Sequence, residues 1–175
     1  MTAAPLALVL LLAAEGTPAA TTIPQLQPLA FLAGSCWTAT FPDGKQTDTH
    51  CFETVFGGRF IRDRHVVKNG KAPYEGETLY AWDANTKKLV YTYWASDGGL
   101  SSGRVEPAAS GELTFHEAYV GDAGAMRLKT TWTPKPDGYE ASTMSRKDGD
   151  GAWKEMWKMS FRRDAPTATS EGSSR

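Results

Sequence analysis

Residues 31–60 read FLAGSCWTATFPDGKQTDTHCFETVFGGRF, and this stretch decides the fold. Pro42-Asp43-Gly44-Lys45 is typical of a tight turn, because proline presets φ, aspartate bonds its own backbone and glycine accepts positive φ. With Asp43-Gly44 as the loop, Cys36 lies opposite Cys51 across a hairpin. Facing side chains are close enough for a disulfide, which contributes ~3 kcal/mol for a loop of this size. The sequence therefore predicts a Cys36–Cys51 disulfide.

The same register predicts the two faces of this hairpin, because side chains alternate along a strand. The outer face carries the two cysteines with four threonines: Thr38, Thr40, Thr47 and Thr49. The inner face carries an aromatic and polar set: Trp37, Ala39, Phe41, Gln46, Asp48 and His50. We expect His50 to point into the interior with Trp37.

Composition indicates one soluble domain without a polyanionic partner. The chain has 175 residues, 41% hydrophobic and 22% charged, with a formal net charge of −1. Without residues 1–20, which contain Glu15 and no base, 19 basic residues face 19 acidic ones. The bases are scattered, whereas nucleic-acid binding needs a clustered basic surface.

Residues 1–20 have the layout of a secretory signal peptide. An apolar run, Leu6–Ala14, is followed by small residues and Pro18, and is too short to span a bilayer. An N-terminal helix is the alternative. Paired cysteines also favour an oxidising compartment, so we expect an exported, periplasmic or secreted protein without a lipid anchor. Residues 164–175, rich in Ser and Thr, are predicted to be disordered.

Turn signals recur at short spacing along residues 21–163, and the runs between them are rich in β-branched and aromatic residues. This spacing predicts consecutive antiparallel hairpins. About ten strands are enough to close an all-β, up-and-down barrel that leaves no sheet edge. One helical turn is expected over residues 28–33.

Asn69-Gly70 is the strongest hairpin dipeptide in the chain, and a two-residue loop there pairs Arg64 with Glu75 and Arg62 with Glu77 on the outer face. The opposite, aromatic-rich face then points inward. That face carries Ile61, Asp63, His65, Val67, Tyr74, Thr78, Tyr80 and Trp82, with Gly76 opposite Asp63. A four-residue loop after Asp83 points Tyr91 and Tyr93 inward and Trp94 outward. A one-residue change in that loop would reverse all three.

Several short motifs together resemble an uncharacterised bacterial calycin-like domain family. They are Phe56–Ile61 (FGGRFI), Tyr74–Gly76 (YEG), Trp82-Asp83 with Thr86, and Trp94 with Asp97. The resemblance implies a lipocalin-like barrel of unknown function, and its pattern favours Trp94 inside. Residues 31–34 and Trp37 are similar to nitrobindin-type haem-binding barrels and to lipocalins. That similarity implies a cation–π contact from Arg162 or Arg163 onto Trp37.

These observations predict a binding barrel that holds an apolar or amphipathic small molecule in an aromatic-lined interior. The candidate ligand-binding residues are Trp37, His50, Asp63, His65, Tyr80, Trp82 and Trp94. Each of the three tryptophans also has a simple structural interpretation as core.

Three alternatives remain open. The first is haem binding, for which the resemblance places Met156 where nitrobindins carry the iron-ligating histidine. The second is an enzyme that uses Asp63, His65 and Tyr80 as acid–base groups. The third is a barrel filled by its own side chains. The three histidines, with His116 expected on the surface, have no metal-binding spacing, so the sequence predicts neither a metal nor a cofactor. The oligomeric state is left open.

Overall fold

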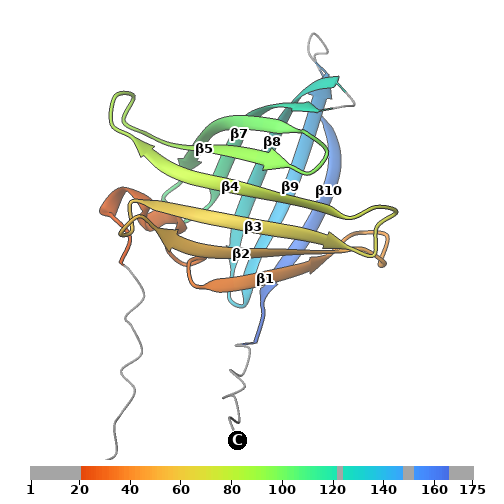
Figure 1. Cartoon of the computed structure of the whole chain (residues 1–175), viewed down its shortest axis with the longest axis horizontal. Coiled ribbons are helices and arrows are strands. Elements are labelled where there is room, and N and C mark those ends of the chain that lie inside the picture. Colours follow the sequence, from red (N-terminus) through yellow and green to blue (C-terminus); the bar gives the residue numbers. More distant parts are fainter. Residues whose placement is uncertain (1–20, 122–123, 148–151, 166–175) are drawn as a thin grey trace, which may run out of the picture.

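A computed structural model describes residues 21–121, 124–147 and 152–165 of the chain (Figure 1). One 3₁₀ helix precedes ten strands. In chain order the elements are η1 (Pro24–Leu29), β1 (Ser35–Thr40), β2 (Thr47–Val55), β3 (Phe60–Lys68), β4 (Tyr74–Asp83), β5 (Lys88–Ala95), β6 (Leu100–Pro107), β7 (Leu113–Gly121), β8 (Gly124–Lys135), β9 (Gly138–Lys147) and β10 (Lys154–Arg163).

The strands form a closed antiparallel barrel in which each pairs with its neighbour in sequence. β1 pairs with β10 to close the ring, through Trp37 opposite Arg163 and Thr38 opposite Arg162. The predicted all-β, ten-stranded barrel with a short N-terminal helical turn is confirmed. The helical turn itself begins earlier than predicted, at Pro24, because proline suits the first turn of a helix.

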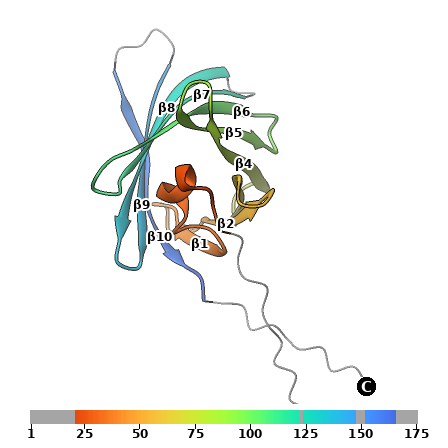
Figure 2. The same ribbon diagram turned by 90° about the vertical axis from the view of Figure 1, so that its left-hand side faces the viewer.

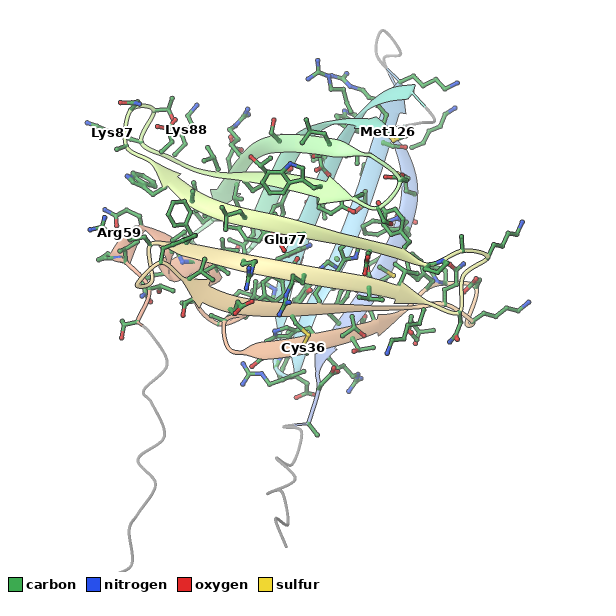
Figure 3. The ribbon with its side chains drawn as sticks, in the orientation of Figure 1. Cys36, Arg59, Glu77, Lys87, Lys88 and Met126 are labelled. Atoms are coloured by element: carbon green, nitrogen blue, oxygen red, sulfur yellow. A yellow bond between two sulfur atoms is a disulfide. The ribbon has the colours of Figure 1, made fainter. Side chains whose placement is uncertain are left out.

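The first hairpin has the predicted register. Cys36 lies opposite Cys51 and the two form a disulfide. Figure 3 shows Cys36 on the outer side of the barrel. Trp37 and Asp48, on the other face, are 4% and 6% exposed, so the predicted inner face of this hairpin is confirmed.

The hairpin between β3 and β4 differs from the prediction by two residues. Arg64 pairs with Glu77, and His65, not Asp63, lies opposite Gly76. The predicted Arg62–Glu77 and Arg64–Glu75 pairs are therefore wrong, and Arg62 instead binds Glu53 at 2.6 Å. The loop is longer than the Asn69-Gly70 dipeptide because Pro73 has no N–H to donate to a ladder that would start beside it. A shift of two keeps every side chain on its predicted face.

The hairpin between β4 and β5 has the register predicted from a four-residue loop. Tyr80 lies opposite Tyr91, so Tyr91 is 5% exposed inside the barrel, whereas Trp94 is 47% exposed. The inclusion of Trp94 among the interior ligand-binding residues is therefore wrong. The alternation of side chains along β5 leaves it no route to the interior once Tyr91 points inward.

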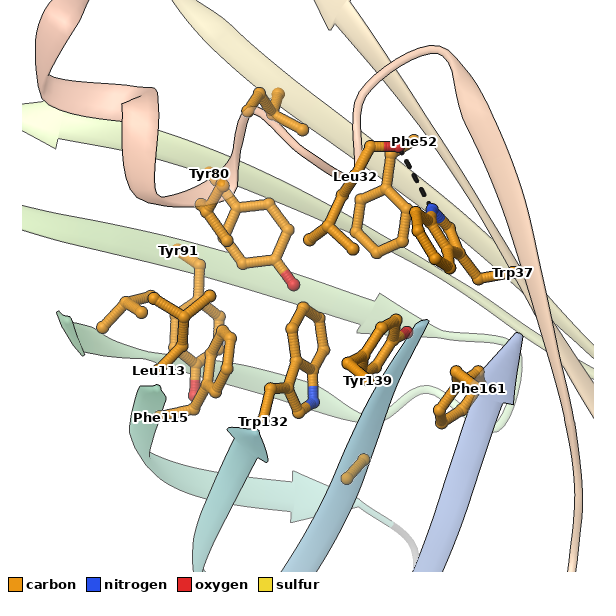
Figure 4. Close-up of a cluster of buried hydrophobic side chains, with 14 of the residues drawn as sticks. Leu32, Trp37, Phe52, Tyr80, Tyr91, Leu113, Phe115, Trp132, Tyr139 and Phe161 are labelled. Carbon is orange, nitrogen blue, oxygen red and sulfur yellow. Dashed lines mark hydrogen bonds between the residues drawn. The ribbon is translucent and has the colours of Figure 1, made fainter. Parts of the chain in front are cut away.

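One end of the barrel is closed by η1, which lies across the opening in Figure 2. Leu26, Leu29 and Leu32 are fully buried there. Trp37 packs beside them and its indole N–H donates to the carbonyl of Leu32, 3.2 Å away (Figure 4). The guanidinium of Arg163 lies 4.7 Å from the Trp37 ring, which is the cation–π contact expected from the resemblance.

A row of aromatic rings crosses the interior next to this closed end (Figure 4). Phe161 stacks on Tyr139 at 4.8 Å, Tyr139 lies 4.9 Å from Trp132, and Trp132 lies 4.4 Å from Phe115. Because consecutive members come from neighbouring strands, β10 to β7, the row ties one wall of the barrel together. It also separates the closed end from the rest of the interior.

The predicted signal peptide at residues 1–20 lies outside the described residues, as do residues 166–175 of the tail predicted to be disordered from residue 164. At the start of that tail, the N–H of Asp164 donates to the carbonyl of Cys36, 2.9 Å away. Within the described ranges, no helix has the length and apolar character needed to cross a membrane.

Candidate ligand cavity and its histidine–carboxylate cluster

Beyond the aromatic row, the interior contains a cavity of about 490 Å³. It is bordered by the β1–β2 turn and by the β3–β4 loop, at the end of the barrel opposite η1. Its apolar lining includes Val67, Phe115, Leu128, Trp132, Met159 and Phe161. Its polar lining includes Asp48, His50, Asp63, His65, Tyr93 and Glu117. An apolar cavity with a few convergent polar groups is the usual form of a small-molecule site.

The polar groups converge because of the register between β2 and β3, which places His50 directly opposite His65. The two imidazole rings stack with centroids 4.7 Å apart. Asp48 bridges them: its Oδ2 lies 3.1 Å from His50 Nε2 and its Oδ1 lies 3.0 Å from His65 Nδ1. Asp63 Oδ2 lies 2.7 Å from His50 Nδ1. We call these four residues the histidine–carboxylate cluster.

This cluster is charged although it is buried. Burial disfavours the imidazolium of His50, but the carboxylates of Asp63 and Asp48 outweigh burial and raise its pKa to about 10. Burial would also raise the pKa of Asp48, yet hydrogen bonds from His50 and His65 lower it. Both ring nitrogens of His50 face carboxylate oxygens, which only accept hydrogen bonds, so His50 donates from both.

One atom of the cluster has no hydrogen-bond partner among the described residues. Asp63 is 2% exposed, and its Oδ1 makes no hydrogen bond with a described residue. A buried carboxylate oxygen without a donor costs ~1–3 kcal/mol or more. Asp63 lines the cavity, which places this oxygen close to the space that a bound molecule would occupy.

Gly76 makes room for the far side of the cluster. A Cβ on Gly76 would lie 2.7 Å from His65 Nε2 and 2.5 Å from a ring carbon of Tyr93. Without that Cβ, His65 Nε2 and the Tyr93 hydroxyl come within 3.0 Å, and the Tyr93 hydroxyl in turn lies 2.8 Å from that of Tyr74. The room predicted beside Gly76 is therefore filled by protein side chains.

A second polar group lies on the opposite wall of the cavity. Glu117 accepts hydrogen bonds from the hydroxyls of Tyr91, at 3.0 Å, and Ser101. Burial raises the pKa of Glu117. Burial and the negative charge of Glu117 together raise the pKa of Tyr91. The cavity thus has three carboxyl groups, and the lysine at its border is Lys71.

The structure separates the sequence-predicted site residues into two sets. His50, Asp63, His65 and Tyr80 all line the cavity. Trp37 fills the closed end, and Trp82 is half-buried opposite Leu89 and outside the cavity lining. Trp94 lies on the outer wall.

Asp63 and His65, two of the acid–base groups of the enzyme alternative, are not hydrogen-bonded to each other in the described structure. Each histidine instead bonds across strands, His65 with Asp48 and His50 with Asp63. Asp48 and Glu117 are the site residues that the sequence-based selection missed. A signal for Asp48 was present, because it lies two residues before His50 on the predicted inner face.

His116 lies apart from the cavity, on the outside of β7, where its Nε2 lies 2.9 Å from Glu106. The predicted surface position of His116 is confirmed. Spacing along the chain gave no metal motif, yet strand pairing gathers the other two histidines around one carboxylate.

Comparison with known proteins agrees with a barrel of unassigned role. A family model described as "Protein of unknown function (DUF1579)" matches residues 32–163. This match covers β1 to β10 and the three residues before β1, and it begins after η1. A search of curated proteins found no match to the chain.

Proposed function

Because this chain belongs to the DUF1579 family, whose function is unknown, we propose its role from the geometry of the cavity. The protein binds an amphipathic small molecule inside the barrel. The observation that carries the proposal is the cavity of about 490 Å³, in which an apolar wall faces a buried cluster with an unpartnered carboxylate oxygen. A self-filled barrel would not leave this space.

The charges of the cavity indicate the polar end of the ligand. Three carboxyl groups, those of Asp48, Asp63 and Glu117, line it against one imidazolium, that of His50, and Lys71 lies only at its border. A carboxylate or sulfonate on the ligand would meet carboxyl groups of the same sign. A neutral or cationic group with an N–H or O–H donor can instead bond Asp63 Oδ1, so the ligand carries such a donor.

The cavity does not fit haem, the alternative suggested by the nitrobindin resemblance. Met156, at the position of the iron-ligating histidine, borders the cavity but is 47% exposed beside a β-bulge of β10. His50 and His65 stack on each other and share Asp48, so they cannot lie on opposite faces of a macrocycle. The two propionates of haem would also add negative charge to a cavity that already has three carboxyl groups.

We further propose that the barrel is calycin-like and exported. Trp37 beneath Arg163, at 4.7 Å, and a helical turn ahead of the first strand support the calycin assignment. The Cys36–Cys51 disulfide supports an oxidising compartment, in agreement with the apolar leader expected at residues 1–20.

Two fluorescent probes with a common aromatic body test the binding proposal. N-phenyl-1-naphthylamine is neutral and has one N–H donor, whereas 1-anilinonaphthalene-8-sulfonate adds an anionic group. We expect the neutral probe to bind with a blue-shifted emission and to bind more tightly than the sulfonate, because of the carboxyl groups in the cavity. Fluorescence titration measures both affinities, and the opposite order would contradict the predicted ligand charge.

A substitution that fills the cavity locates the probe. Leu128→Trp places a larger ring on the cavity wall and should lower the affinity of N-phenyl-1-naphthylamine by about tenfold or more, equivalent to ~1.4 kcal/mol. Leu100→Trp is the matched control, because Leu100 is 49% exposed and does not line the cavity. Equal affinities in the two variants, or no binding by the wild-type protein, would reject the cavity as the site.

A further inference from the structure

Asp48, His50 and His65 each offer a metal-ligating atom in the same small region of the cavity wall. These atoms lie within 4.8 Å of one another, on neighbouring strands β2 and β3. We propose that these three side chains bind one divalent transition-metal ion of the zinc class in the wall of the cavity. The inference goes beyond the proposed binding of a small molecule and does not depend on it.

The distances already approach those of a metal site. Asp48 Oδ2 lies 3.1 Å from His50 Nε2, and Asp48 Oδ1 lies 3.0 Å from His65 Nδ1. Two ligands that share a tetrahedral zinc ion, with bonds of about 2.0–2.2 Å, lie roughly 3.4 Å apart. The three ligating atoms lie within 4.8 Å of one another and the two imidazoles are stacked, so an ion can replace the bridging protons once the rings turn to point both nitrogens at it.

The partners of the two histidines are those of a metal centre. A metal-ligating histidine almost always donates its other ring N–H to a carboxylate, a carbonyl or water, which fixes its orientation. His50 Nδ1 lies 2.7 Å from Asp63, and His65 Nε2 lies 3.0 Å from the hydroxyl of Tyr93. Both rings are thus held by their far nitrogens, with Nε2 of His50 and Nδ1 of His65 left for the ion.

The charge of the cluster also balances around an ion. Asp48 and Asp63 are 6% and 2% exposed and have two negative charges between them when ionised. Buried charges are paired or coordinate metals. A divalent ion with two neutral imidazoles makes the cluster neutral. When the ion enters, His50 loses the proton on Nε2. The proton of His65 moves from Nδ1 to Nε2, which faces Tyr93.

The ligand set selects the kind of ion and the kind of site. Imidazole nitrogens suit zinc, copper, nickel and iron, whereas calcium and magnesium prefer oxygen ligands. Three protein ligands leave one tetrahedral position for water or another small ligand, which is the form of an open site and not of a structural one. That position is reachable from the cavity, which all three residues line.

Titration of the chelator-treated full chain with Zn²⁺ by calorimetry, and with Co²⁺ by visible absorption, tests the proposal. We expect one ion per chain, an intense tetrahedral Co²⁺ spectrum, and a higher melting temperature with Zn²⁺ because the ion binds the folded state. His50→Gln should lower affinity by more than about 100-fold, and Asp63→Asn, which removes a supporting carboxylate, by about 10–100-fold.

His116→Gln is the matched control, because His116 lies outside the cavity against Glu106 and its loss should leave ion binding unchanged. Asp48→Asn is nearly isosteric and provides a second ligand variant if His50→Gln does not fold. No uptake by the wild-type chain, or an equal loss in His116→Gln, would overturn the proposal. The naphthylamine titration is separate, so failure of the metal site and failure of the small-molecule site give different results.

Discussion

The two ends of the barrel interior are built from the same strands but in opposite ways. At the closed end, Leu26, Leu29 and Leu32 are fully buried against Trp37, with one indole hydrogen bond between them. At the open end, the strands point charged groups inward, and the pKa values of Asp48 and His50 shift in opposite directions. The closed end removes apolar area from water, which favours folding.

At the open end, holding charged side chains inside the barrel instead lowers the stability of the fold. Taking carboxylates and an imidazolium out of water carries a desolvation cost that pairing does not always recover. Residues that oppose stability in this way persist at sites of function. Changes at the closed end should therefore affect folding, and changes at the open end should affect binding more than folding.

The largest effect is expected for a truncation at the closed end. Trp37→Ala removes a 4% exposed ring and its contact with Arg163, and such changes cost ~3–5 kcal/mol of unfolding free energy. Trp94→Ala, the same substitution on the 47% exposed outer wall, should change stability by no more than about 0.5 kcal/mol. Urea unfolding of both variants measures the contrast, and equal losses would contradict the assignment of the two faces.

An intermediate effect is expected for Gly76→Ala at the open end. The new Cβ would lie within 2.7 Å of His65 Nε2 and of the Tyr93 ring, so both side chains must move, at a typical cost of ~1–3 kcal/mol. Because His65 belongs to the histidine–carboxylate cluster, affinity for Zn²⁺ should fall with stability.

Gly70→Ala is the control for this substitution. Its Cβ would meet the end of the Gln46 side chain at 3.1 Å, which can rotate away, and the carbonyl oxygen of Ala72 at 3.3 Å, a milder contact than those at Gly76. Calorimetry with Zn²⁺ and urea unfolding compare the two variants. A Gly76→Ala protein with wild-type affinity would show that the position of His65 does not matter for the ion.

The smallest effect is a dependence of stability on pH. Burial raises the pKa of Glu117 in the folded state, so the folded state holds this proton more tightly than the unfolded chain. The contribution of Glu117 to the stability of the folded state is therefore greatest at low pH. It is lost as the pH rises from the ordinary pKa of a carboxyl group through the raised pKa of Glu117. Glu117→Gln should flatten the stability profile across this window.

Glu106 gives the opposite sign on the outer surface. Hydrogen bonds from Arg104 and His116 lower its pKa, so its contribution is present above the ordinary carboxyl value and is lost as pH falls through the lowered one. Urea unfolding at a series of pH values distinguishes Glu117→Gln from Glu106→Gln. The same profile in both variants would contradict the buried position of Glu117.

Local turn chemistry was sufficient for much of the fold. Pro42 to Gly44 determined the register that pairs Cys36 with Cys51, and the spacing of the turns determined the number of strands. Alternation along each strand then predicted which side chains point inward. The predicted register between β3 and β4 was wrong by two residues, but a shift of two leaves every side chain on the same face. These properties depend on residues that are neighbours in sequence.

Tertiary structure decided the site. The turn between β2 and β3 is unusual, because Phe56 has a φ of 52°. The pairing of these strands places His50 opposite His65, so that His50 bonds Asp63 and His65 bonds Asp48. Whether the interior holds a cavity depends on how η1 and the aromatic row fill a closed ring, since both a full and a hollow barrel need aromatic lining. Contact between side chains of different strands, and the volume that they leave, exist only after closure.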